Sequence, residues 1–244
     1  MPIAITRDVS PRFNECEITH IKRVPIDVEV ARAQHRGYGN ALRLNGCEVV
    51  ELPAEADLPD SVFVEDAAFI LPEVAVITRP GVDSRRREAE SIARALEPYR
   101  ELIFIREPAT VDGGDVLVLG KNIYVGLSTR SNQEAIDQLN ALLAEFGYTA
   151  MGLVLRDCLH LKTAVTRVDD STLLINRNWV DAENFNGFGL IDVDPSEPFA
   201  AIACPLEIRS SSRPPSPRHA QGSRHGDARS GPLKWMNSPR RRER

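Results

Sequence analysis

The sequence predicts an α/β fold made of repeated units, each with a strand hairpin, a helix and a third strand. Pairs of short apolar runs flank turn residues, and each pair is followed by a helical pattern and then by another strand-like run. The same order recurs over residues 67–105, 115–155 and 161–193. Since units of about forty residues cannot bury their own apolar faces, we expect them to pack in a ring whose loops meet at one mouth. Function is expected in those loops.

The first elements along the chain are a helix from about residue 27 to residue 44 and the strand-like run CEVVELP that follows it. In the first repeated unit, AAFIL and VAVIT flank the turn Pro72-Glu73. A helix is expected from Ser84 to about Leu96, and ELIFI supplies the closing strand. This segment therefore contains the complete order of hairpin, helix and strand.

The second unit has the clearest helix signals. DVLVLG and NIYVGL flank Gly120-Lys121, and TAMGLVL follows the helix. We expect the helix over residues 131–146, with Ser131 as its N-cap, Glu134 completing a capping box and Gly147 ending it. Its apolar face is expected to contain four residues at helical spacing: Ala135, Leu139, Leu142 and Leu143.

The third unit pairs TAVTRV with TLLINR around Asp169-Asp170. A short helix is expected near residues 179–185, followed by the strand FGLIDV. Together with the N-terminal helix and strand, the three units give a predicted secondary structure for the chain as far as residue 193.

Composition excludes several classes of protein. The chain has 42% hydrophobic residues and no apolar stretch long enough to cross a membrane, and its first ten residues lack the pattern of a signal segment. We therefore expect a cytoplasmic protein that does not bind membranes. The four cysteines are scattered without a CxxC pair, which favours neither a zinc site nor a disulfide framework.

Charge divides the chain into two domains, an acidic body over residues 1–204 and a basic tail over residues 205–244. The tail has ten basic and three acidic residues, a net charge of +7, which leaves −12 for the body. An acidic body attracts a small cationic substrate and repels nucleic acid. Because the tail is rich in Pro, Ser and Arg and has no apolar period, we predict that it is disordered. An alternative is an interaction module.

Three carboxylates in LPDSVFVEDAAF stand immediately before the first hairpin: Asp60, Glu65 and Asp66. A solvated loop explains them by residue type alone. Their functional interpretation is a clamp for a cation, because carboxylates match the planar N–H donors of a guanidinium with paired, charge-assisted hydrogen bonds.

Two further motifs stand at the corresponding places of the next units. In ATVDGGDVL, Asp112 and Asp115 flank two glycines, and in CLHLKTAV His160 opens the third hairpin. A histidine has a near-neutral pKa that suits proton transfer. In a ring, the acids and the imidazole would all face one mouth.

Five motifs in order, LPDSVFVED, TRPGVDSRRRE, VDGGDVL, VGLSTRSNQ and CLHLK, resemble the dimethylarginine dimethylaminohydrolase family over about 190 residues. The resemblance implies a five-bladed ββαβ propeller of the pentein type. It also implies hydrolysis of methylated arginine to citrulline and a methylamine through a cysteine thiolate, without metal or organic cofactor. A homodimer is left open.

The resemblance also implies roles for single residues. His160 resembles the general acid/base, and Asp112 the carboxylate that orients it. Asp66 would hold the substituted guanidinium beside Asp60 and Glu65. Three further residues would bind the amino-acid end of the substrate: Arg85 and Arg130, as clamps for the α-carboxylate, and Ile18, as a covering loop residue.

The sequence departs from the family pattern after EPFAA, at residues 197–201. The family's nucleophilic cysteine lies in a last unit that has no counterpart here, and no cysteine follows Cys204. Cys204 lies too early to match it, and Cys158 is a weak substitute. We therefore expect an incomplete last unit and no dimethylargininase activity. The tail resembles a frameshifted translation, with a genuine divergent tail as the alternative.

Two other functions are weighed against this interpretation. One is an arginine deiminase or amidinotransferase, which the single VED loop and STRSNQ disfavour. The other is a protein that binds arginine-like cations through the three acids without catalysing a reaction.

Overall fold

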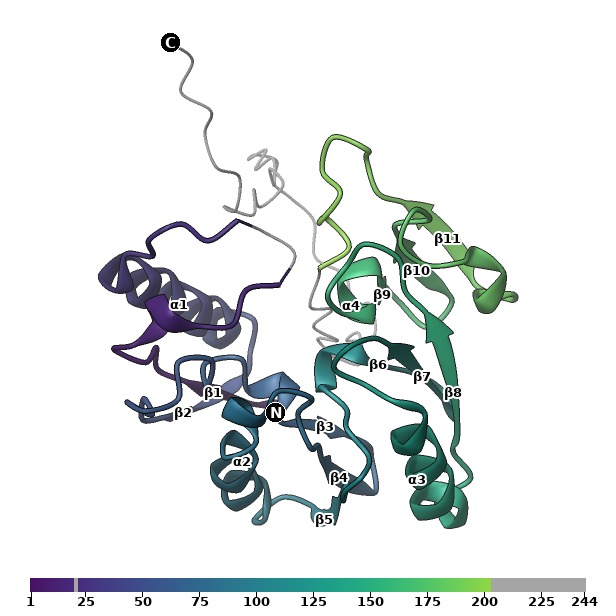
Figure 1. Ribbon diagram of the computed structural model, residues 1–244, viewed down its shortest axis with the longest axis horizontal. Helices are drawn as coiled ribbons and strands as arrows, with labels where there is room; N and C mark the ends of the chain where they lie inside the picture. The colour runs from purple at the N-terminus through teal and green to yellow at the C-terminus, as the bar shows by residue number, and fades with distance from the viewer. Residues whose placement is uncertain (20–21, 203–244) are drawn as a thin grey trace, which may run out of the picture. The chain divides into compact units, whose positions relative to one another are not determined.

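A computed structural model describes residues 1–19 and 22–202, and these residues contain four small sheets (Figure 1). Cys204, the domain boundary expected there and the predicted disorder of residues 205–244 lie outside the described residues. The first sheet pairs β1 (Ile3–Arg7) in parallel with β2 (Glu48–Leu52), and α1 (Val28–Leu44) connects the two strands.

The other three sheets have three strands each and share one topology: an antiparallel hairpin whose second strand pairs in parallel with the strand after the helix. The predicted ββαβ units are therefore confirmed. Their strands are β3 (Ala68–Ile70), β4 (Val74–Ile77) and β5 (Glu101–Phe104), then β6 (Val116–Leu119), β7 (Asn122–Leu127) and β8 (Thr149–Val154), then β9 (Val165–Arg167), β10 (Thr172–Ile175) and β11 (Gly189–Asp192).

In each unit a helical segment lies between the hairpin and the third strand. The α-helices are α2 (Glu88–Leu96) and α3 (Gln133–Leu143), which lie beside the sheets of their own units in Figure 1, and the single-turn α4 (Leu161–Ala164). Short 3₁₀ turns are found at Phe13–Glu15, Val64–Asp66, Asp83–Arg85, Gly113–Asp115, Ala144–Phe146 and Ala182–Phe185. The short helix expected in the third unit is the last of these 3₁₀ turns.

The core lies between the sheets, since both faces of the central strands are buried. On β4, Val74 and Val76 pack into a cluster shared with the second unit, whereas Ala75 and Ile77 pack toward α2 and the N-terminal sheet. Successive side chains of a strand point to opposite faces, so a continuous apolar run fills two clusters. A third cluster joins the second and third units in the same way.

The predicted helices are confirmed with small corrections. Asp27 caps α1 by accepting hydrogen bonds from the N–H groups of Glu29 and Val30. Gly147 adopts a left-handed conformation, with φ of 74°, and ends the helical segment of the second unit. The Ser131 cap was wrong, because Asn132 accepts from the N–H of Ala135.

The predicted apolar face of α3 is wrong at one residue. Leu142 is exposed, while Ile136 is buried with Ala135, Leu139 and Leu143. The helix is therefore turned slightly about its own axis compared with the orientation that the sequence pattern predicted.

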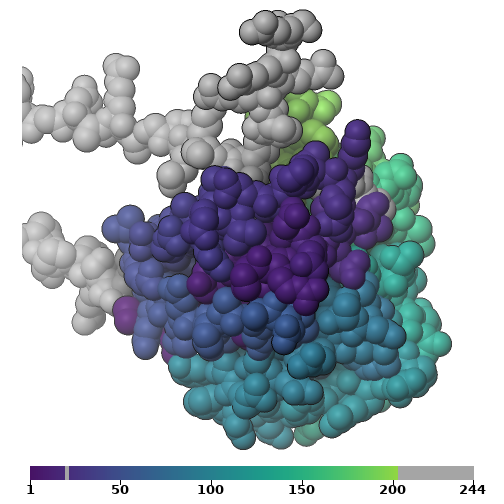
Figure 2. Space-filling view, turned by 60° about the vertical axis from the view of Figure 1, so that its left-hand side comes forward, coloured from purple at the N-terminus to yellow at the C-terminus, as the bar shows by residue number. Residues whose placement is uncertain are grey.

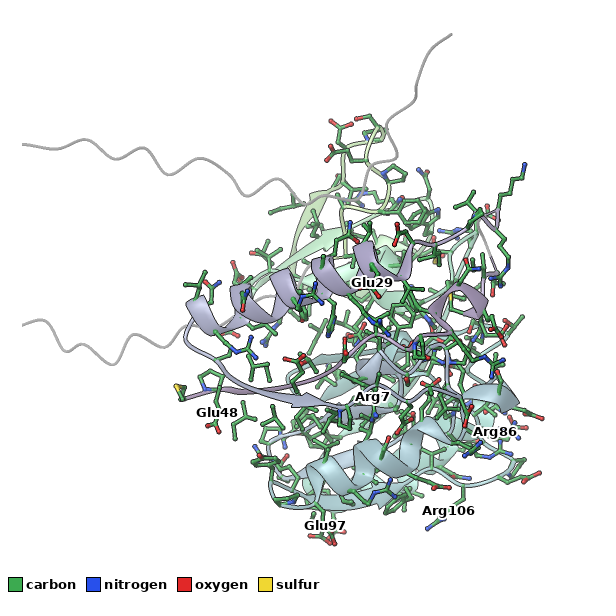
Figure 3. The ribbon with its side chains drawn as sticks, turned by 90° about the vertical axis from the view of Figure 1, so that its left-hand side faces the viewer. Arg7, Glu29, Glu48, Arg86, Glu97 and Arg106 are labelled. Atoms are coloured by element: carbon green, nitrogen blue, oxygen red, sulfur yellow. The ribbon has the colours of Figure 1, made fainter. Side chains whose placement is uncertain are left out.

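Arg7 ties the N-terminal sheet to the first unit. Its side chain is 2% exposed, pairs with Glu55 at 2.9 Å and donates a hydrogen bond to Ser91 of α2 at 2.6 Å. In Figure 3 Arg7 is labelled near the middle of the view, whereas Arg86 and Arg106 lie toward the edge of the molecule. Figure 2 shows the N-terminal residues in purple shades, spread beside the blue and teal residues of the first unit.

None of the helices in the described ranges has the length and apolarity that crossing a bilayer requires.

Candidate active site

A cavity of about 350 Å³ lies where the starts of the three units meet the N-terminal loop. Six of the eight residues singled out in the sequence line it: Asp60, Glu65, Asp66, Arg85, Arg130 and His160. The structure therefore brings together residues that are up to one hundred positions apart in the chain. The remaining lining residues are Glu17, Phe63, Gly114, Leu159, Lys162, Thr163, Thr166 and Ile202.

Asp66 is the most constrained acid of the site. It ends the 3₁₀ turn Val64–Asp66, is 6% exposed, and accepts hydrogen bonds from Arg85 Nη1 at 2.8 Å and from the Gly114 N–H at 3.0 Å. Burial alone would raise the pKa of Asp66, but the charges of Arg85 and His160 and the hydrogen bonds lower it below its ordinary value. Asp66 is therefore an anion at neutral pH.

Arg85 is held between two buried acids. Besides Asp66, it donates from Nε and Nη2 to the two carboxylate oxygens of Glu88, at 3.1 and 2.9 Å. Nη2 also lies 3.4 Å from the backbone oxygen of Asp60. All three guanidinium nitrogens of Arg85 thus donate to acceptors of the protein itself, which leaves few N–H donors for a substrate carboxylate.

His160 stands directly before α4, with 13% of its side chain exposed. Nε2 lies 4.0 Å from Asp66 Oδ1, and Nδ1 lies 3.3 Å from Asp115 Oδ1. Burial acts to lower the pKa of His160, but Asp115 and Asp66 outweigh it and the pKa is raised. The imidazole is therefore placed to take up and release a proton.

Gly114 permits this arrangement. A Cβ atom there would lie 2.8 Å from Asp66 Oδ1 and 2.9 Å from Cγ of the His160 ring. At Gly113 a Cβ atom would lie 1.9 Å from the backbone oxygen of Glu65. The two glycines of VDGGD thus serve close approach of backbone to the neighbouring unit.

Asp112 does not contact the imidazole as the sequence led us to expect. Its Oδ1 accepts from the Gly81 N–H at 2.9 Å, and its Oδ2 lies 3.7 Å from Arg130 Nη1. The carboxylate next to Nδ1 belongs to Asp115, because the 3₁₀ turn Gly113–Asp115 turns that side chain toward the third unit. Burial and the nearby charge of Asp66 raise the pKa of Asp112.

The N-terminal loop closes one side of the site through Asp60. Both carboxylate oxygens of this buried residue accept from the Glu17 N–H, at 3.1 and 3.2 Å, and burial raises the pKa of Asp60. Arg130 Nη2 donates to Thr19 Oγ1 at 3.1 Å. Ile18 lies half-buried between these contacts and is not among the residues that line the cavity.

Glu65 lies at the rim, where its carboxylate pairs with Lys162 at 3.0 Å and remains 66% exposed. A surface ion pair of this kind contributes little to stability. The pair therefore holds the Glu65 side chain only weakly in its present orientation.

The described part of the chain contains three free cysteines, Cys16, Cys47 and Cys158, and none of them lines the cavity. Burial raises the pKa of Cys158 to about 11, and its Sγ lies 3.7 Å from the backbone oxygen of His160. A thiol with so high a pKa is a poor source of the thiolate that attacks substrates.

Donor atoms of Asp66, Asp112 and His160 lie within 4.8 Å of one another. Both carboxylates already lie against arginine guanidiniums, so we assign no metal to them.

Two residues at this site, Glu17 and Glu88, were not predicted from the sequence, and Asp115 was noted in its motif without a role. The spacing Arg85–Glu88 is a helical i,i+3 pair, which could have indicated Glu88. No local pattern distinguishes Asp115 from Asp112, because the partner of each lies in a different unit.

Comparison with known proteins agrees with the geometry. The family described as "N,N dimethylarginine dimethylhydrolase, eukaryotic" matches residues 12–181. An N(G),N(G)-dimethylarginine dimethylaminohydrolase of Streptomyces coelicolor is 40% identical over 172 residues, which cover 70% of this chain and 67% of that protein. Its counterpart of the same name in Pseudomonas aeruginosa is 34% identical over 177 residues, or 72% of this chain and 70% of that protein.

Among solved structures, the chain is similar to the Pseudomonas aeruginosa enzyme, a mutant with a cysteine replaced by serine, complexed with citrulline. The TM-score is 0.78 at 30% sequence identity, and the match covers 84% of this chain and 82% of that one.

Proposed function

Because the chain belongs to the dimethylarginine dimethylaminohydrolase family and has its pentein-type fold, we propose that its cavity binds the guanidinium of a methylated arginine. The observation that carries the proposal is the buried anion of Asp66 in the cavity wall, whose Oδ1 lies 4.0 Å from His160 Nε2. A carboxylate whose pKa is lowered, in a partly enclosed site, favours a planar cation over a neutral ligand.

The acids divide the binding of the guanidinium. Asp66 has Oδ1 directed at the cavity while Arg85 holds Oδ2, so the position of the anion is fixed before a ligand arrives. Asp112, which does not line the cavity, acts from behind it: its buried Oδ2 lies 3.7 Å from Arg130 Nη1. Glu65 turns in from the rim. This arrangement offers oxygen acceptors on two sides of a planar cation.

The amino-acid end of the ligand is assigned to Arg130 and the loop that holds Ile18. Arg130 is 5% exposed, lines the cavity and contacts Thr19 of that loop. Arg85, which was expected to share this role, acts through Asp66 instead. Citrulline binding by the Pseudomonas aeruginosa relative supports a ligand of this size.

Hydrolysis of a guanidinium requires a nucleophile in addition to His160. A thiolate attacks the guanidinium carbon, His160 protonates the departing amine, and a water activated by His160 then releases citrulline and the free thiol. No thiol of the described residues lines the cavity. We therefore propose that this chain binds methylarginine and does not turn it over.

Two measurements on the full chain test the proposal. Calorimetry with asymmetric dimethylarginine should show binding that Asp66→Asn weakens at least tenfold, whereas Glu97→Gln, which removes an exposed charge, leaves affinity unchanged. A citrulline assay should show no release. Absence of binding contradicts the site, and turnover above that of a His160→Ala variant contradicts the loss of activity.

A chimera tests whether the missing step is the only defect. Residues after 198 are replaced by the corresponding C-terminal part of the Streptomyces coelicolor relative. We expect citrulline release from dimethylarginine that His160→Ala abolishes. A chimera that folds and binds ligand without turnover would show that the site has lost more than its nucleophile. Faster turnover of arginine than of dimethylarginine would indicate a deiminase.

A further inference from the structure

We propose that Glu88 is a positioning residue of the cation site: it fixes Arg85 and, through Arg85, the carboxylate of Asp66. Glu88 lies in the first turn of α2, is 3% exposed and is not among the residues that line the cavity. The inference deepens the proposed function, since it rests on Asp66 as the anion that receives a guanidinium. It concerns how that anion keeps its orientation and its attraction for a cation beside an arginine of the protein itself.

Glu88 and Asp66 contact different edges of the Arg85 guanidinium. Glu88 accepts from Nε at 3.1 Å and from Nη2 at 2.9 Å, a bidentate pair that fixes the plane of the guanidinium. Nη1 then points at Asp66 Oδ2, to which it donates at 2.8 Å. The other oxygen of Asp66 receives the Gly114 N–H at 3.0 Å and lies 4.0 Å from His160 Nε2. Without Glu88 the guanidinium would be free to rotate and to present its other edge to Asp66.

The second effect of Glu88 is on the charge of the site. Arg85 and Asp66 form a pair whose charges cancel, so this pair alone would offer a cationic ligand little attraction. Glu88 adds a second carboxylate to the same guanidinium, and the three groups together then carry a net charge of −1. Since none of the three side chains is more than 8% exposed, water screens this charge weakly. A guanidinium that reaches Asp66 therefore still meets an excess of negative charge.

The surroundings of Glu88 make its charge sensitive to pH. The charged groups around it are Arg85, Asp60, Asp66 and, through Ser91 of α2, Arg7 of β1 with its partner Glu55. The strands β3 and β4 contribute apolar side chains to the contact with α2. Burial, which is the largest effect, and the nearby acids raise the pKa of Glu88 to about 7, although Arg85 acts to lower it. Near neutral pH the negative charge of Glu88 is therefore present in only part of the molecules.

Ligand binding and the ionisation of Glu88 are consequently linked. A cation held by Asp66 favours the ionised form of Glu88, so binding lowers the pKa of Glu88. By the same coupling, ionisation of Glu88 tightens binding. The affinity of the site for a guanidinium is therefore expected to rise as pH increases through about 7.

Nuclear magnetic resonance of the full chain tests the relay without ligand, so it decides about Glu88 even if dimethylarginine does not bind. All proteins carry His160→Gln, which removes a histidine that also titrates beside Asp66. The carboxyl ¹³C signal of Asp66, assigned by its loss in Asp66→Asn, should show a titration step near pH 7. The step should disappear when Glu88→Gln is added and persist with Glu90→Gln, which changes an exposed acid of the same helix.

Calorimetry tests the effect on the cation. In the same His160→Gln background, affinity for asymmetric dimethylarginine should rise about threefold to tenfold from about pH 6 to about pH 8, as expected for one buried charge near the ligand. Glu88→Gln should remove this rise, and Glu90→Gln should retain it. Absence of binding at every pH would contradict the proposed function, and the titration of Asp66 would then decide about Glu88.

The inference is overturned if the titration step of Asp66 is unchanged in Glu88→Gln, or if affinity rises with pH equally with and without this substitution. A Glu88 that only stabilised the fold would alter thermal unfolding and leave both readouts unchanged. Should Glu88→Gln fail to fold, the two carboxyl signals of the parent protein decide. The step of Asp66 must share its midpoint with the titration of Glu88, and separate midpoints overturn the inference.

Discussion

Arg85 donates a hydrogen bond from Nη1 to Asp66 Oδ2 at 2.8 Å, and the two side chains are only 4% and 8% exposed. This buried pair fixes the anion that faces the cavity. It also means that neither charge can be removed without leaving the other unpaired in a poorly hydrated place.

Replacing the buried arginine is expected to destabilise the chain strongly. In Arg85→Met, Asp66 and Glu88 lose their common partner, which should cost about 3–5 kcal/mol of unfolding free energy. Urea denaturation measures the loss. The neighbouring Arg86 pairs with a mostly exposed Asp83 at the edge of the molecule in Figure 3, so Arg86→Met should cost less than about 1 kcal/mol. Equal losses would contradict the difference in burial.

Glu88 should give the chain a characteristic pH dependence. Burial raises its pKa from 4.5 to about 7 despite the Arg85 guanidinium. The folded chain then holds this proton more tightly than the unfolded chain, so the contribution of Glu88 to stability declines as pH rises between these values, by about 3 kcal/mol. In Glu88→Gln that decline is absent. Measured from about pH 5 to about pH 8, the free energy of unfolding of Glu88→Gln should therefore fall less steeply than that of the unmodified chain. Parallel curves for the two proteins would contradict the titration of Glu88.

Gly114 should be intolerant of a side chain because of what lies around it. A methyl group in Gly114→Ala would meet Asp66 Oδ1 and the His160 ring, and the required shifts should weaken dimethylarginine binding at least tenfold in calorimetry. Gly37 in α1 is the matched control, since nothing lies within 4 Å of a Cβ atom there. Gly37→Ala should retain full affinity and add about 0.5–1 kcal/mol of stability. Normal affinity in Gly114→Ala would mean that the acid and the imidazole do not need their present spacing.

Two leucines of α3 test the packing between units. Leu139 is completely buried in the cluster shared by the first two units, and Leu139→Ala should cost about 2–5 kcal/mol of unfolding free energy. Leu142 is 36% exposed on the same helix, so Leu142→Ala should cost less than about 1 kcal/mol. Similar losses for the two variants, measured by urea denaturation, would favour the helix orientation that the sequence pattern predicted, in which both leucines are buried.

The repeat of strands and helices could be predicted because its signals are local. Apolar runs on both sides of Gly120-Lys121 or Asp169-Asp170 indicate a hairpin wherever the rest of the chain lies. The orientation of α3 was predicted less well. Leu142 and Ile136 both lie near the edge of the apolar face, and the neighbouring sheet decides which of them is buried.

The residues of the site could be predicted as a set, and their pairings could not. The sequence shows that Asp66, Asp112 and His160 stand at equivalent places of three units. It does not show that Asp115 turns toward the third unit, because that depends on the 3₁₀ turn that contains it and on Ser131 of the following loop. Nor does the sequence show that Arg85 is paired with Asp66 and Glu88 and therefore has little of its guanidinium left for a substrate.

Asp66, Gly114 and His160 line the cavity from three units whose sheets share no strand. A ligand held by Asp66, Gly114 and His160 together would act as a bridge among three separately hydrogen-bonded modules. Its binding energy would oppose local opening in each of them. Deuterium uptake by the amides of β4, β7 and β10 should then slow in concert when dimethylarginine is added, although none of these strands carries a residue that touches it.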